Sequence, residues 1–137
     1  MNPRWPWAAL CLTACVTLGL ALWLEPSASG VGTHTQLGLP PCGLYAWTGL
    51  PCPGCGLTTS FAHLARLELL PALDANPVGL PLFLGTAASI PLTAVGFVRR
   101  WSLLSVIDAL QIERPLLWLM GAAGASWAAR LFSMWAS

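Results

Sequence analysis

Three cysteines in one short segment are the residues of this chain whose types and spacing could carry chemistry. Cys52 and Cys55 form a C-P-G-C-G turn, and Cys42 lies ten residues upstream. Two thiolates separated by two residues can bind the same ion, and the glycine after the second permits a positive φ that turns backbone amides toward the sulfurs. The loop 40–60 therefore predicts a knuckle of the kind that binds zinc.

A closed tetrahedral zinc site needs four ligands, and the cysteines supply three of them. His63 is the first candidate for the fourth ligand because it follows the knuckle closely in the sequence, and His34 is the second candidate. The predicted metal site therefore consists of Cys42, Cys52, Cys55 and His63, with zinc as the expected cofactor.

The same spacing also suits thiol redox chemistry. A helix predicted to start near Thr58 would place its positive N-terminal end beside Cys55 and lower thiol pKa values. In this alternative the chain is a membrane thiol-disulfide oxidoreductase that uses Cys52 and Cys55 with Cys42 as a resolving thiol. A purely structural disulfide between two of the three is the third interpretation. No catalytic base, nucleophile elbow, phosphate loop or carboxylate pair accompanies the cysteines, so the sequence leaves open whether the protein is an enzyme.

The composition indicates a membrane protein. Of the 137 residues, 56% are hydrophobic and only 8% are charged, whereas an average soluble domain carries roughly 25% charged residues. This balance excludes a free-standing soluble enzyme, and the apolar content excludes disorder. All six basic residues are arginines, and they form no basic patch. Nucleic acid is therefore excluded as a partner.

Three apolar stretches predict transmembrane helices, since a spanning helix needs about 20 mostly apolar residues. They cover about 5–24, 77–98 and 115–135. Asn76 is expected to cap the second helix, with Pro77 at its first position. Arg130 is the charge inside the third stretch, and it is expected to snorkel toward the membrane surface.

Two shorter amphipathic segments, 58–70 and 101–113, are predicted to lie along the membrane surface as interfacial helices. The predicted fold is therefore an all-α membrane protein with three transmembrane helices plus one or two short interfacial helices, as a single domain over 1–137. The expected partners are the lipid bilayer and other membrane helices, including further copies of the chain. Small residues on the third stretch would allow such close packing: Gly121, Gly124, Ala125 and Ala128.

The arginines predict the orientation. One precedes the first stretch and three lie between the second and third, whereas only two fall in the other segments. Cytoplasmic segments carry an excess of arginine, so the N-terminus is expected in the cytoplasm and the segment from Cys42 to Asp74 outside.

The segment from Cys42 to Pro77 resembles an uncharacterised family of small bacterial multi-pass membrane proteins, a domain of unknown function. The family pattern is a cysteine, then T-G, then C-P-x-C-G-x-T-R, then an acidic residue and an N-P pair before an apolar span. This chain carries the same order, with Thr59 in place of the arginine. The resemblance implies a multi-pass protein of the bacterial inner (cytoplasmic) membrane and singles out the cysteine motif, but it implies no activity.

Overall fold

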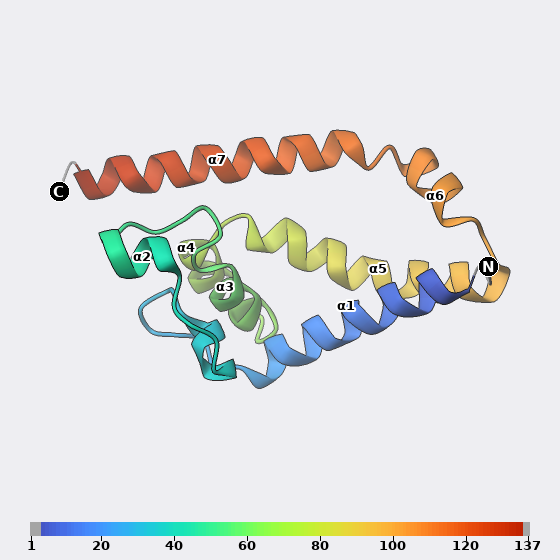
Figure 1. Ribbon diagram of the computed structural model, residues 1–137, viewed down its shortest axis with the longest axis horizontal. Helices are drawn as coiled ribbons and strands as arrows, with labels where there is room; N and C mark the ends of the chain where they lie inside the picture. Colours follow the sequence, from blue (N-terminus) through green and yellow to red (C-terminus); the bar gives the residue numbers. More distant parts are fainter. Residues whose placement is uncertain (1–3, 136–137) are drawn as a thin grey trace.

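The computed structural model describes residues 4–135, and the regular elements of this part are all helices, with no strand (Figure 1). The all-α class is therefore confirmed. The elements are α1 (Trp5–Trp23), the 3₁₀-helix η1 (Thr33–Leu37), α2 (Gly43–Thr48), α3 (Leu57–Leu64), α4 (Leu69–Ala75), α5 (Gly79–Arg99), α6 (Leu103–Leu110) and α7 (Glu113–Trp135).

The two apolar helices α1 and α5 lie side by side and antiparallel (Figure 1). Trp7 is 1% exposed and covers Gly96, where a Cβ atom would lie 2.7 Å from the indole. The Trp7 Nε1–H donates to the carbonyl of Trp101 at 2.8 Å. These contacts place the start of α1 and the end of α5 together, and the cysteine loop therefore lies at the opposite end of the pair.

Two helices of the described part, α1 and α5, are long and apolar enough to cross a membrane. Within the apolar windows of these helices, 17% and 11% of the residues are buried. A core helix of a soluble protein would be mostly buried, so these two helices present their apolar surfaces outward. The predicted boundaries 5–24 and 77–98 agree with the observed helices to within two residues.

The expected third span is not among the candidate spans: 115–135 is helical, but α7 falls short of the apolarity of α1 and α5. The physical reason lies in its composition. Glu113, Arg114 and Arg130 are charged, and the central run of glycine, alanine and serine is only weakly apolar. No residue of α7 is buried. Residues 4–135 therefore contain two candidate spans rather than three.

The predicted interfacial segment 58–70 is two helices instead of one. Helix α3 ends at Leu64 and α4 begins at Leu69, because Leu67 adopts a left-handed conformation with φ 63°. Arg66 lies in this turn, and its guanidinium donates to the carbonyls of Ala62, Ala21 and Leu22. The last two carbonyls belong to the end of α1, so Arg66 fixes α3 against that helix. The second predicted segment, 101–113, contains the short exposed helix α6.

Candidate metal centre

The turn between Cys52 and Cys55 is formed by local hydrogen bonds. The N–H of Cys55 donates to the carbonyl of Cys52 at 3.0 Å, and the N–H of Leu57 donates to that of Gly54 at 3.2 Å. Pro53 and Gly54 occupy the two central positions of the first turn, where these residue types favour tight turns. The two sulfur atoms consequently lie 3.2 Å apart on one side of the loop.

Gly56 has the positive φ that the sequence predicts, with a value of 84°. It is also the N-cap of α3, which begins at Leu57, one residue before the predicted start near Thr58. A Cβ atom at Gly56 would lie 2.2 Å from the carbonyl oxygen of Ala75 and 2.9 Å from that of Gly30. Only glycine therefore fits here, because two backbone segments close on this position from both sides.

Cys42 joins the two knuckle cysteines from a second segment, where it is the N-cap of α2. Gly49 ends α2 in a left-handed conformation, and the Thr48 hydroxyl donates to the carbonyl of Leu44 at 2.6 Å. The T-G pair thus stops the helix and returns the chain toward Cys52. The sulfur atoms of Cys42, Cys52 and Cys55 all lie within 4.8 Å of one another. The structure therefore brings together all three predicted cysteine ligands.

The environments of the three thiols differ. Hydrogen bonds from the backbone N–H of Tyr45 and from the thiols of Cys52 and Cys55 lower the pKa of Cys42 to about 7. Burial raises the pKa of Cys55 to about 12, and the neighbouring Cys52 adds to the effect. Cys42 is therefore ready to act as a thiolate, whereas Cys55 needs a cation beside it before it loses its proton.

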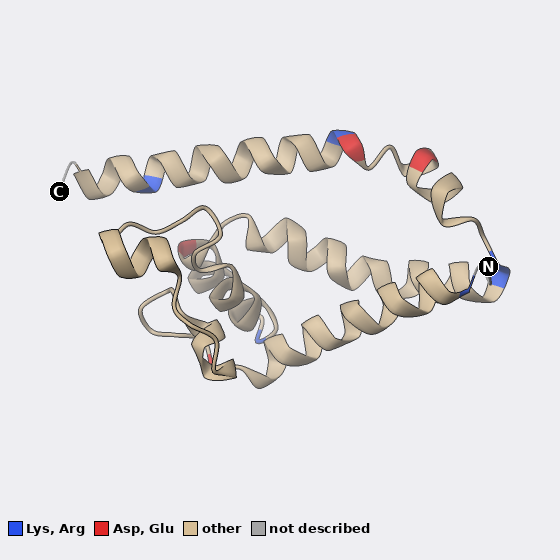
Figure 2. Ribbon diagram, viewed as in Figure 1, with Lys and Arg blue, Asp and Glu red and all other residues tan. Residues whose placement is uncertain are grey.

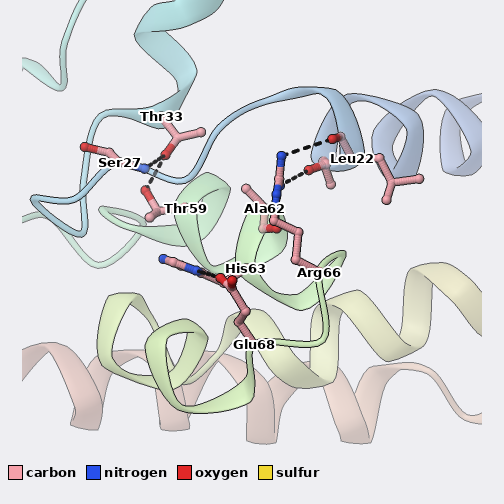
Figure 3. A network of polar contacts seen from close by, with 9 residues as sticks. Leu22, Ser27, Thr33, Thr59, Ala62, His63, Arg66 and Glu68 are labelled. Atoms are coloured by element: carbon pink, nitrogen blue, oxygen red, sulfur yellow. Dashed lines mark hydrogen bonds and ion pairs between the residues drawn. The ribbon is translucent and has the colours of Figure 1, made fainter.

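The cysteines line a cavity of about 400 Å³ together with residues of the loop before η1 and the start of α3. His34, at the first turn of η1, lines the same cavity. His63 does not, and its Nδ1 lies 2.6 Å from Glu68 Oε2 in the turn between α3 and α4 (Figure 3). Of the two histidines that the sequence offers, the structure places the second candidate at the cysteines.

A further residue, Asn76, holds the knuckle in place, a role that was not predicted from the sequence. Asn76 is 2% exposed, and its side-chain amide donates to the carbonyls of Pro53 and Cys55 at 3.3 and 3.1 Å. Its Oδ1 accepts from the N–H of Val78 at 3.0 Å, which is the bond that a capping asparagine makes, although the regular helix α5 begins at Gly79 with Val78 as its N-cap residue. The Asn76-Pro77 pair before α5 was the feature of the sequence from which this role could have been inferred.

Arg130, which was expected to snorkel, has hydrogen-bond partners within the protein at the cysteine end of the molecule. Its guanidinium donates to the carbonyls of Ala75, Asp74 and Cys55 at 2.7, 3.4 and 3.5 Å. One turn earlier, Trp127 Nε1–H donates to the carbonyl of Pro51 at 2.7 Å. These bonds attach α7 to both sides of the cysteine motif. No pattern in the sequence indicated this attachment, because the two segments lie more than 70 residues apart.

Comparison with known proteins finds one similarity, and it covers this segment. No curated protein and no solved structure matches the chain. Residues 42–90 match the model of a family described as a protein of unknown function (DUF2752). The matched part contains the three clustered cysteines, Gly56, Asn76 and the first half of α5. The resemblance seen in the sequence is thereby confirmed, and the candidate metal centre lies within a segment similar to this domain of unknown function.

Proposed function

We propose that the protein is an integral membrane protein whose cysteine loop binds a structural zinc ion at the membrane surface. The observation that carries this proposal is the clustering of three sulfur atoms, from two chain segments, within 4.8 Å. Zinc prefers thiolate ligands in a tetrahedral arrangement, and a structural site contributes directly to the folding free energy. The loop has little apolar core of its own, so an ion would supply the cross-link that holds α2, the knuckle and α3 together.

Charge supports the placement in the membrane. Arg4 precedes α1, and Arg99 and Arg100 lie at the end of α5, and the contact between Trp7 and Trp101 puts these ends together. Figure 2 shows blue segments at this end of the helix pair. With α1 and α5 both spanning, the arginine-rich end faces the cytoplasm and the cysteine loop faces outward.

Reporter fusions test this orientation. Fusions at Ser27, after α1, and at Gln111, after α5, are expected to report opposite sides of the membrane, with Ser27 outside. The reason is that each position follows one crossing helix, and the arginines hold the other ends inside. A cytoplasmic signal at Ser27 would contradict the orientation.

A thiol oxidoreductase is the second candidate function. It is favoured by one observation, the contact of 3.2 Å between the sulfurs of Cys52 and Cys55 beside a thiol whose pKa is about 7. A low thiol pKa is typical of reactive cysteines. The raised pKa of Cys55 opposes it, since a buried neutral thiol exchanges slowly. Zinc therefore remains the better supported function.

Metal content and thiol state, measured on the same purified full-length sample, distinguish the two functions. The zinc proposal predicts an equimolar amount of zinc and protection of Cys42, Cys52 and Cys55 from alkylation until a chelator is added. Absence of zinc, together with a Cys52–Cys55 disulfide in native membranes, would reject zinc in favour of thiol chemistry.

A further inference from the structure

The three cysteines leave one position of a tetrahedral site open, and the cavity beside them identifies the side chain that can fill it. Among the histidines of the described chain, His34 alone lines this cavity of about 400 Å³. It is half-buried, and it lies in a segment different from those that carry the thiols. A ligand from η1 would therefore add a third segment to the site.

The hydrogen bond of His34 leaves one ring nitrogen for a metal. Its Nε2 lies 3.2 Å from the carbonyl oxygen of Pro40. A carbonyl only accepts hydrogen bonds, so Nε2 carries the proton, and the lone pair of the neutral ring is on Nδ1. Metal-binding histidines typically donate their other N–H to a carbonyl or carboxylate, which fixes the tautomer and the ring orientation. His34 already makes this bond.

The residue before His34 anchors η1 beside the cysteine loop. Thr33 is fully buried, and its hydroxyl is 2.8 Å from that of Thr59 in α3 and accepts from the N–H of Ser27 at 3.0 Å (Figure 3). Thr59 lies four residues after Cys55. This buried pair keeps the start of η1 against the helix that follows the knuckle.

The ring must still approach the sulfurs, because its nitrogens are not among the atoms that lie within 4.8 Å of one another. Pro40 is two residues before Cys42, so the hydrogen bond from His34 couples the ring to the segment that carries this thiol. When the thiolates close around an ion, Cys42 draws this segment and the ring inward together.

Given the proposed zinc function, on which this inference rests, we propose that His34 is the fourth ligand and that the site is a Cys₃His centre. His63, the nearer histidine in the sequence, stays with Glu68 in the turn after α3. The ion then connects η1, α2 and the knuckle, three segments that share few apolar contacts.

Paired glutamine variants test the assignment on the full-length protein in detergent. Glutamine retains a side-chain N–H for the carbonyl of Pro40 but is a poor zinc ligand. His34→Gln is expected to lower zinc affinity at least about 100-fold, the upper end of the loss found when only an outer-shell partner is removed. His63→Gln, the matched control, is expected to bind zinc as the wild type does. X-ray absorption at the zinc edge should show imidazole scattering in the wild type and in His63→Gln.

A rescue variant separates ligand loss from misfolding. His34→Cys supplies a fourth thiolate, so it should restore zinc binding without the imidazole signature. Unchanged zinc affinity and unchanged imidazole scattering in His34→Gln would overturn the assignment of His34 while leaving the zinc function intact. A wild-type protein without zinc would instead reject the zinc function, and the assignment with it.

Discussion

Gly56→Ala is expected to destabilise the protein by about 2 to 5 kcal/mol and to abolish zinc binding. A left-handed conformation costs an L-residue about 1 to 2 kcal/mol, and overpacking of a close-packed position adds about 1 to 3 kcal/mol. The added methyl group would overlap the carbonyl oxygens of Ala75 and Gly30, which are backbone atoms and cannot rotate away. The loop before η1 or the end of α4 must then move off the knuckle.

Gly49→Ala is the matched control for this substitution. Gly49 has a similar φ of 71°, but a Cβ atom there meets nothing within 4 Å. It should therefore show only the conformational cost of about 1 to 2 kcal/mol. The measurement is the midpoint of chemical or thermal unfolding in detergent, followed by helix content. Equal losses in the two variants would show that the close approach at Gly56 contributes nothing.

Cys55→Ser is expected to remove nearly all bound zinc. Structural zinc sites in small domains bind with about 10 to 16 kcal/mol, so each of four ligands accounts for about 2.5 to 4 kcal/mol, or about 100- to 1,000-fold in affinity. The loss follows because Cys55 is the most buried of the three thiols, 7% exposed, and without it only Cys42 and Cys52 remain in the cluster. A competition titration against a chromogenic chelator measures the affinity.

Cys15→Ser provides the comparison for Cys55→Ser. It removes a thiol from α1 that is exposed and outside the cluster, so zinc affinity should not change. Retention of an equimolar zinc ion by Cys55→Ser would mean that the cluster is not the binding site. A structural disulfide would give another pattern, in which Cys55→Ser exposes a newly free Cys52 thiol and neither protein contains zinc.

Features of the molecule that depend on residues close together in the sequence were predictable. The C-P-G-C-G spacing alone brings the sulfurs of Cys52 and Cys55 together, because the intervening turn is closed by its own backbone hydrogen bonds. The positive φ of Gly56 followed from the same motif. The helices α1 and α5 were predictable because each is a long charge-free stretch, and hydropathy is a sum over local residues.

Features set by tertiary contacts were not predictable. Leu67 breaks the expected helix 58–70 in a conformation that is rare for leucine, and Arg66 in the same turn is held by carbonyls 44 and 45 residues away. The surroundings of the two histidines were not predictable for a similar reason. His63 is close to the knuckle along the chain, but α3 carries it toward Glu68, whereas buried Thr33 holds His34 at the cavity.

The two arginines at the cysteine end share a feature with consequences for the lipid. Arg66 donates to carbonyls at the end of α1, and Arg130 donates to carbonyls at the end of α4. Helix C-termini carry about half a negative charge, which stabilises a cation placed there. Both guanidinium groups therefore have hydrogen-bond partners inside the protein and do not require an anionic lipid headgroup. In the proposed orientation, the cysteine end would accordingly face a leaflet without needing acidic phospholipid there, whereas polybasic ends depend on such lipids for their attraction to the bilayer.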